Sequence, residues 1–280
     1  MSYETILYEK QGHVARIIAN RPEVRNAQSR LMLEEIDNAF READADDDVR
    51  VIVVGGKGQH FSAGHDLGSK DEMADRETRG YPKNIEERVS RSRRLYLETT
   101  LRWRNISKPT IAMVQGYCIM GGLMLACACD IIIAAEDARF SDRSVRQGSP
   151  HVQIDNLPWE VGIRKAKEIL WTGDFFDAHE ALRLGLVNRV VTVDKLETET
   201  MELANRIALQ EPFVVRMSKA SLNATQDMMG YTNAVSASFR FHNLTDQRRN
   251  IEGFRVPRKE GESVADWVAR RDKEFGDHKG

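Results

Sequence analysis

The sequence predicts an α/β fold, because short β-branched segments alternate with longer amphipathic ones over the first two thirds of the chain. Four apolar segments bounded by glycine or charged residues are typical of buried strands: residues 13–19, 49–56, 109–116 and 130–136. From about residue 195 onward the pattern is almost wholly helical. We therefore expect a core over residues 1–194 and a helical region with a tail over residues 195–280.

Helices are expected where apolar side chains recur every three to four residues. Ser29 precedes such a pattern in residues 29–46, so it is expected to cap this helix. A short apolar helix enters through two glycines at residues 121–129. Two further helices are expected at residues 166–173 and 177–186.

Residues 68–108 differ from their surroundings. The segment begins highly charged, with Gly80 and Pro82 as breakers, and then becomes amphipathic. This pattern predicts a mobile loop followed by a helix. The helix carries Arg91, Arg93 and Arg94, and two interpretations stay open for this run: a solvated helix face, the commoner case for charged runs, or a phosphate-binding patch.

Composition excludes several classes of protein. The chain has 280 residues and a formal net charge of -2, which suits one large domain and argues against nucleic acid as the main partner. Its three cysteines have no disulfide-framework spacing, so reduced thiols and a cytoplasmic protein are expected. No secretory signal pattern and no apolar run long enough to span a membrane is present in the sequence.

Two glycine-containing turns follow two of the predicted strands, at residues 55–67 and 115–125. Backbone N–H groups at such a turn, or at the helix N-terminus that follows the second one, can stabilise an anion. Two converging N–H groups form an oxyanion hole. Each turn taken alone is more typical of a tight connection. The neighbouring His60, His65 and Asp66 lack a further ligand at a known metal-site spacing, so no metal is expected.

Five motifs occur in order along the chain: RPEVRNA (21–27), FSAGHDL (61–67), KPTIAMVQGYCIMGG (108–122), ACDIIIAAEDARF (128–140) and WTGDFFDAHEALRLGLVNRVV (171–191). Together they resemble the enoyl-CoA hydratase/isomerase (crotonase) superfamily. The resemblance covers roughly residues 5–254 and is strongest from 108 to 191. It implies a right-handed spiral of ββα turns, with a C-terminal helical region that forms trimers, which often pair into hexamers.

The resemblance also implies a substrate and a site. The substrate would be an acyl-CoA thioester, whose carbonyl would lie between the backbone N–H groups of His65 and Gly121. Many members have alanine at the place of His65, so the resemblance assigns its amide, not its imidazole, to the chemistry. No cofactor is implied beyond the coenzyme A of the substrate. The CoA-binding residues would be Arg25, Ala27, Ala63, Asp66 and Leu67.

This sequence departs from the family at the two glutamates that hydratases use to handle water and the α-proton. Met124 and Ser144 stand at those places. Methionine cannot transfer a proton, and serine is a poor base unless another group activates it. Because general acid–base catalysis contributes about 10²–10⁴-fold per group, we expect weak or absent hydration. Met124 and Ser144 are instead expected to shape the acyl pocket.

Three other side chains are candidates for acid–base chemistry. His151, Asp142 and Asp155 belong to or border a segment expected to line the same pocket. For each of them a structural or surface role remains the alternative.

The sequence therefore predicts an acyl-CoA lyase or isomerase that acts through a thioester enolate and is not a standard hydratase. A non-catalytic acyl-CoA-binding protein is the alternative. RNA binding would need a basic helix, for which the run of arginines from Arg91 to Arg94 is the one candidate.

Overall fold

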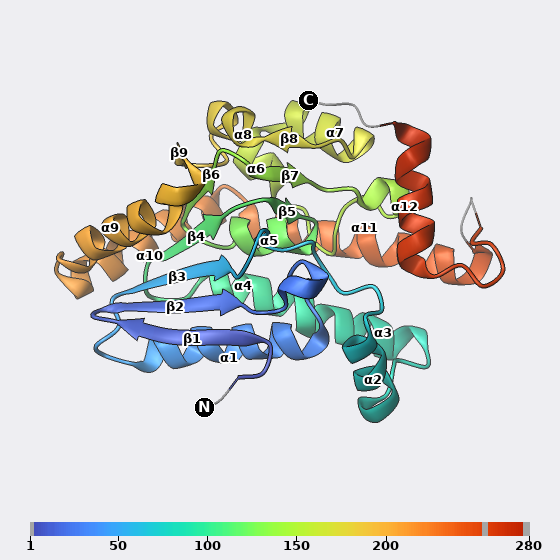
Figure 1. Cartoon of the computed structure of the whole chain (residues 1–280), viewed down its shortest axis with the longest axis horizontal. Coiled ribbons are helices and arrows are strands. Elements are labelled where there is room, and N and C mark those ends of the chain that lie inside the picture. The colour runs from blue at the N-terminus through green and yellow to red at the C-terminus, as the bar shows by residue number, and fades with distance from the viewer. Residues whose placement is uncertain (1–2, 254–256, 277–280) are drawn as a thin grey trace.

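A six-stranded sheet forms the centre of the computed structural model, which describes residues 3–253 and 257–276 (Figure 1). Its strands lie in the order β1-β2-β3-β4-β6-β9. β1 and β2 are antiparallel, and every other neighbouring pair is parallel. The strands are β1 (Ile6–Gln11), β2 (Val14–Ala19), β3 (Val51–Gly56), β4 (Thr110–Val114), β6 (Ile131–Ala135) and β9 (Arg189–Val191). The α/β prediction is confirmed, and the four predicted strands correspond to β2, β3, β4 and β6.

The inner strands are apolar on both sides, because successive side chains enter different cores. In β2, Ile17 belongs to one hydrophobic cluster and Ile18 to the other. In β3, Ile52 and Val53 divide in the same way. A parallel sheet of this kind requires cover on both faces.

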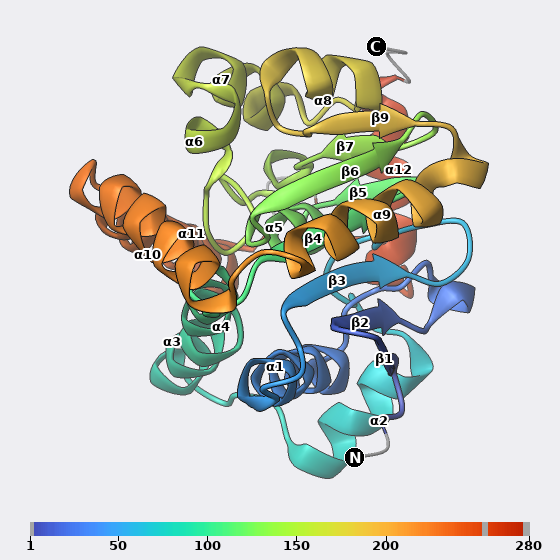
Figure 2. The same ribbon diagram turned by 90° about the vertical axis from the view of Figure 1, so that its left-hand side faces the viewer.

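Two long helices provide that cover. α1 (Arg30–Ala45) packs on one face, and Ser29 caps it as predicted, because its side chain accepts a hydrogen bond from the Met32 amide. α9 (Leu196–Ala208) crosses the other face, over β3, β4 and β6 (Figure 2).

A second, three-stranded sheet was not predicted. It consists of β5 (Tyr117–Ile119), β7 (Arg139–Ser141) and β8 (Phe176–Asp177) in the order β5-β7-β8. The helices expected near it are present, with α6 in addition: α5 (Gly121–Cys127), α6 (Leu157–Val161), α7 (Ile163–Thr172) and α8 (Ala178–Leu184).

The expectation of a loop after residue 68 is wrong for most of that segment. α2 (Lys70–Arg79) begins at a capping Ser69, whose side chain accepts a hydrogen bond from the Glu72 amide. The buried Glu72 pairs with Arg76 within the helix at 2.9 Å. Three further helical pieces follow: α3 (Ile85–Ser92), the π-helical turn η2 (Arg93–Glu98) and α4 (Thr99–Arg104).

The C-terminal elements are helices, as predicted: α10 (Pro212–Met228), α11 (Tyr231–Glu252) and α12 (Val264–Phe275). α12 packs against the short helix η3 (Ser144–Gln147), where Arg146 lies over the Phe275 ring and ion-pairs with Asp272. The tail is therefore docked over its described part. Among the helices of the described residues, none has both the length and the apolar character that crossing a bilayer requires.

A largely buried carboxylate lies where the C-terminal helices meet the core. Burial raises the pKa of Glu160 in α6 to about 7, although the positive charge of Arg104 acts in the opposite direction. Arg104 itself lies over the ring of Tyr231, 4.3 Å from its centroid. Burial, and next the charge of Glu160, raise the pKa of Tyr231, and the Glu160 charge also contributes to the raised pKa of Cys127.

We predict that the free energy of unfolding decreases between pH 4.5 and 7 partly because of Glu160. The folded chain holds this proton to about pH 7, whereas an unperturbed Glu releases it near 4.5. Folding therefore takes up a proton in this window, and that stabilisation is lost as the pH rises. Glu160→Gln should reduce the fall in the free energy of unfolding between pH 4.5 and 7 by on the order of 2 kcal/mol, as measured by denaturant titrations at each pH. Glu168→Gln, which alters an exposed ion pair, should leave it unchanged; equal slopes in wild type and Glu160→Gln would contradict the prediction.

Candidate active site

The segment after β3 runs as an extended chain between two other segments. On one side the Ser62 amide donates to the Tyr117 carbonyl at 2.9 Å, and the Ser62 carbonyl accepts from the Ile119 amide at 3.2 Å. On the other side the Ala63 amide donates to the Arg25 carbonyl at 2.9 Å. These bonds fix the backbone of residues 62–66 from both edges.

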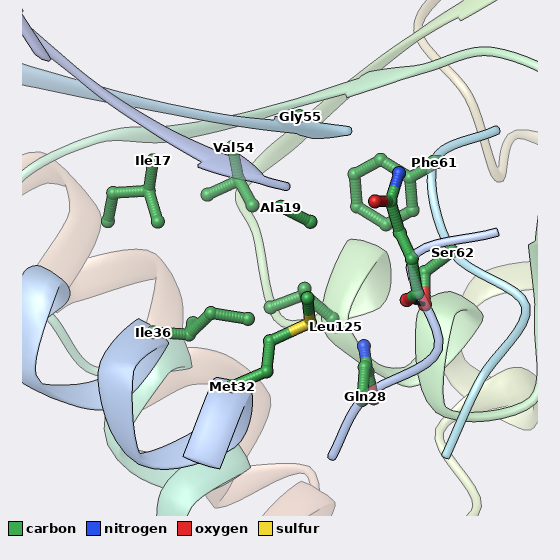
Figure 3. Close-up of a pocket in the computed structure, with 11 residues that line it drawn as sticks. Ile17, Ala19, Gln28, Met32, Ile36, Val54, Gly55, Phe61, Ser62 and Leu125 are labelled. Atoms are coloured by element: carbon green, nitrogen blue, oxygen red, sulfur yellow. Dashed lines mark hydrogen bonds between the residues drawn. The ribbon is translucent and has the colours of Figure 1, made fainter. Parts of the chain in front are cut away.

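A buried asparagine fixes the turn beside this segment. Asn26 has a positive φ of 53°, and its side-chain oxygen accepts a bond from the Arg21 amide. Its side-chain nitrogen donates to the carbonyls of Lys57 and His60, at 3.0 and 2.7 Å. Behind the turn lies an apolar void of about 10 Å³, into which Ile36 and Leu125 point (Figure 3). This void has room for about one water molecule and none for a substrate.

The backbone around His65 directs its own amide away from residue 28. Gln28 forms a parallel bridge with His65, in which the Gln28 amide donates to the Gly64 carbonyl and the Asp66 amide donates to the Gln28 carbonyl. In such a bridge the N–H of the central residue points to the opposite side. Over the described residues, no acceptor takes a hydrogen bond from the His65 amide.

Gly121 is the first residue of α5, and its amide donates to no acceptor in the described part of the chain. The preceding Met120 has a φ of 50°, an unusual value for a non-glycine residue. Its amide donates to the Ser141 carbonyl, and its carbonyl accepts from the Met124 amide, both at 2.9 Å. The surrounding structure therefore holds a costly conformation that orients the Gly121 N–H.

The two segments touch. A Cβ atom added to Gly64, which has a φ of 89°, would lie 3.1 Å from the Gly121 nitrogen. A Cβ atom added to Gly121 would lie 2.6 Å from His65 Nε2 and 2.7 Å from Gln28 Oε1. The His65 imidazole therefore covers Gly121, and Gln28 also donates to the Gly121 carbonyl at 3.2 Å.

The imidazole of His65 is neutral. Burial, and next the positive charges that His242 and Arg91 can carry, lower the pKa of His65 to about 3. Its ring packs on Tyr96 with the centroids 4.4 Å apart. Its Nε2 atom is buried and has no hydrogen-bond partner in the described part of the chain. A nitrogen with this pKa is a very weak base at neutral pH.

Gln28, His65 and Met120, which directly precedes Gly121, border a cavity of about 500 Å³, within the usual range for small-molecule sites. Its walls come from the loop after β3, from α2, α3 and η2, from the η3 region, and from α11 and α12. Side chains on the wall that the chemistry could use are His65, Tyr96, Ser144, His242 and Arg91. Within the described residues, no group of three or more His, Cys, Asp or Glu side chains could hold a metal ion.

Comparison with known proteins identifies the family. Residues 9–278 match the family model described as enoyl-CoA hydratase/isomerase. The chain belongs to the enoyl-CoA hydratase/isomerase family. EchA13 of Mycobacterium tuberculosis, an enoyl-CoA hydratase by its provisional name, is 43% identical over 86% of this chain and 80% of its own. A protein of Rhizobium meliloti named "Probable enoyl-CoA hydratase" is 33% identical over 98% of this chain and 99% of its own.

Solved structures of the family have the same fold. A probable enoyl-CoA hydratase from Mycobacterium thermoresistibile superposes with a TM-score of 0.82 at 43% identity, covering 89% of this chain and 99% of that one. An enoyl-CoA hydratase/isomerase from Xanthobacter autotrophicus Py2 superposes with a TM-score of 0.83 at 34% identity, covering 98% and 99%. The predicted family and its α/β fold are thereby confirmed.

The residues expected to bind CoA divide into two groups. Ala63, Asp66 and Leu67 lie on the cavity wall, whereas Arg25 and Ala27 do not. Asp66 is fully occupied by the loop itself: it accepts bonds from Ser69, Gly68 and Arg21. Burial acts to raise the pKa of Asp66, but these hydrogen bonds outweigh it and hold the pKa below its usual value.

Ser144 and Met124, which stand where hydratases of the family have glutamates, differ in their position relative to the cavity. Ser144 lies on the cavity wall, and its buried hydroxyl has no partner among the described residues. Met124 does not reach the wall, contrary to expectation. It belongs to a core cluster with Val152, Ile154 and Tyr231, and Met120 and Tyr96 pack against this cluster. Met124 therefore supports the wall from behind.

The three acid–base candidates from the sequence lie off the cavity wall. Asp142 accepts bonds from the amides of Ser144 and Val152, at 2.9 and 2.8 Å, and so shapes the loop between them. Asp155 accepts from the Leu157 amide, and burial raises its pKa to about 6 against the opposing charge of His151. Nδ1 of His151 lies 2.5 Å from the Val152 carbonyl oxygen. This placement differs from the expectation that the segment presents acid–base groups to the substrate.

Sequence reasoning missed His242. It lies on α11 and on the cavity wall, and its Nδ1 lies 3.1 Å from the His151 carbonyl oxygen. A proton on Nδ1 satisfies that contact and leaves Nε2 as an acceptor. Burial lowers the pKa of His242, although the bond to the His151 carbonyl acts in the other direction. No local pattern marks this histidine, because only the docking of α11 brings it to the cavity.

We predict that Gly121→Ala weakens binding and chemistry of any acyl-CoA by displacing the His65 ring and the Gln28 side chain, and that His65→Ala restores part of both. The added methyl group overlaps the imidazole, and the second change vacates that space. His65→Ala alone should be mild, because the amide remains. Calorimetric titration of wild type, the two single variants and the double variant with an acyl-CoA gives the coupling free energy between the two positions. If His65→Ala alone folds normally and is inactive, the assignment of the amide to the chemistry is wrong.

Proposed function

We propose that this family member acts on an acyl-CoA thioester by stabilising its enolate. One observation carries the proposal: the unbonded amides of His65 and Gly121 lie on two touching segments beside a 500 Å³ cavity. Each N–H group aimed at a developing oxyanion contributes about 10²–10³-fold in rate. With the thioester oxygen between them, the α-carbon becomes more acidic, and the negative charge remains on oxygen. Coenzyme A enters as part of the substrate.

Hydration of ordinary enoyl-CoA is a poor match for this site. Water addition needs a base that activates water and an acid that delivers the proton. Met124 lies in the core, and Ser144 offers a hydroxyl without an adjacent base: the Asp142 carboxylate accepts from backbone amides instead. An isomerisation or another lyase reaction through the enolate needs only a single proton-transfer group. His242 is the best placed candidate for that role.

An assembly of trimers, or of trimers paired into hexamers, accords with the C-terminal helices. α10 and α11 expose many large apolar side chains, which contact with further copies of the chain would bury. They are Phe213, Val214, Met217, Leu222, Met228, Phe241, Leu244 and Ile251. Analytical ultracentrifugation separates these states, and a monomer at micromolar concentration would refute the assembly.

A cytoplasmic location is supported by the cysteines. All three are free, and burial raises their pKa values, so they remain unreactive thiols. Fractionation of the source cells tests this.

We predict that incubation with crotonyl-CoA in D₂O gives deuterium at the α or γ carbon and little water addition. The hole makes the enolate, and a single base returns the proton. Mass spectrometry reads the exchange, and a saturated acyl-CoA reports α-exchange alone. Turnover by hydration at ordinary rates, about 1–10³ per second, would contradict the proposed chemistry. Measurable binding with no change in any mass would favour a protein that binds acyl-CoA without catalysis.

We predict that His242→Asn lowers this exchange by on the order of 10²-fold or more, because asparagine can still donate to the His151 carbonyl but lacks the free ring nitrogen. His151→Asn is the matched control, since its ring lies off the cavity wall. With a pKa held below the usual histidine value, His242 should sustain exchange to a lower pH than free imidazole would. Equal losses in both variants at equal Tm would remove His242 from the chemistry.

A further inference from the structure

A guanidinium that has no carboxylate partner among the described residues lies on the cavity wall. Arg91, on α3, lines the cavity, and its Nε atom is buried without a hydrogen-bond acceptor over the described residues. Its one ring contact there is with Tyr81, whose centroid lies 5.2 Å from the guanidinium carbon. Burying such a group without an acceptor is costly, which indicates a missing anion.

The carboxylates on the same wall are already used. Glu72 pairs with Arg76 at 2.9 Å and accepts from the Arg30 amide. Asp246 pairs with Arg249. Asp66 pairs with Arg21 at 2.8 Å. None of these acids neutralises Arg91.

A second cation strengthens the field at this place. Arg88 lies 5.7 Å from the Tyr81 centroid, and among the described residues its guanidinium donates only to the neutral Asn250 side chain, at 3.3 Å. Arg76 lies over the same ring at 4.9 Å. Three guanidinium groups thus surround Tyr81, and within residues 3–253 and 257–276 only that of Arg76 has an acidic partner.

Arg91 belongs to the part of the cavity near the oxyanion hole. Its charge contributes to the lowered pKa of His65, after burial and His242. It also acts on Tyr96, which contacts the His65 ring. The π-helical turn η2 explains this arrangement: residues five apart diverge on an α-helix, but the wider turn lets Arg91 and Tyr96 both face the cavity.

We propose that the acyl group of the substrate carries a carboxylate, which Arg91 binds beside Tyr81, with Arg88 adding positive charge. The inference rests on the proposed acyl-CoA function and specifies its substrate class. A guanidinium presents two parallel N–H donors that match the two oxygens of a carboxylate. The phosphates of CoA are the other possible anion. The carboxylate is favoured because Arg91 lies on the wall of α3 and η2, which also holds the Tyr96 ring against His65, and not on the Ala63–Leu67 loop beside which CoA is expected.

The test compares three ligands by calorimetry: glutaryl-CoA, pentanoyl-CoA with the same number of acyl carbons and no carboxylate, and free coenzyme A. Wild type should bind glutaryl-CoA on the order of tenfold to a hundredfold more tightly than pentanoyl-CoA. Arg91→Gln should abolish that preference and leave pentanoyl-CoA unaffected. Arg91→Lys, which keeps the charge but not the paired donors, should retain part of it. Arg94→Gln is the control, since Arg94 is exposed on the same helical stretch and off the wall.

Three results would overturn the inference. Equal affinity of wild type for glutaryl-CoA and pentanoyl-CoA would show that the site does not recognise an acyl carboxylate. Equal weakening of all three ligands by Arg91→Gln, with Tm unchanged, assigns Arg91 to a phosphate of CoA. No binding of any of the three ligands to wild type overturns the proposed acyl-CoA function as well, which the first two results leave intact.

Discussion

The contact between residues 63–66 and the first turn of α5 is the constraint on which the site depends. Two backbone N–H groups can share one oxygen only if their chains approach to within a few ångströms. Gly64, Gly121 and Gly122 allow this, since an added Cβ atom would lie 3.1 Å or less from the facing segment at each position. Because the His65 segment is bonded on both edges and Gly121 begins α5, the two proposed donors would need no reorganisation when charge develops on a carbonyl oxygen. The close contact of the two segments therefore requires these glycines. The proposed chemistry requires that contact in turn.

The surroundings of that contact are polar and incompletely bonded. His65 Nε2, Gln28 Oε1, Ser144 Oγ and Arg91 Nε all lack a hydrogen-bond partner over the described part of the chain, and all four residues line one cavity. Each such atom costs on the order of 1–3 kcal/mol when buried. A structure keeps them only if the rest of the fold enforces the arrangement or a ligand satisfies them. Their gathering on one wall points to a ligand with several polar atoms near its reacting carbon.

The sequence predicted the central sheet because β2, β3, β4 and β6 are long enough to show continuous apolar character, and it predicted α1 from its stripe and its Ser29 cap. It could not predict β5, β7 and β8, whose two or three residues carry no period. α2 was mistaken for a loop because its stabilising contacts are polar: a capping Ser69 and a Glu72 buried against Arg76. At the site, the family's motifs predicted the amides of His65 and Gly121 as the donors, and this assignment stays a prediction. Whether Met124, His151 and His242 line the cavity or lie behind its wall depends on the docking of α11, which no local sequence pattern encodes.

The division of the cavity between two parts of the chain constrains the reaction. In the proposed function, the core supplies the polarising amides, and α3, η2 and α11 supply the groups that move a proton or select an acyl group. Once the thioester oxygen is stabilised, the α-proton is acidic enough for a neutral imidazole to remove it, whereas water addition still needs an activated nucleophile. Over the described residues the wall holds His242, a serine hydroxyl and His65, whose imidazole is a very weak base, while its acids are held by arginines or by the loop. This set of groups is the reason why we propose proton relocation on an enolate instead of hydration. The uncompensated charge of Arg91 acts in the same direction, because a carboxylate on the acyl group would fix the substrate by its far end without adding a base near the α-carbon.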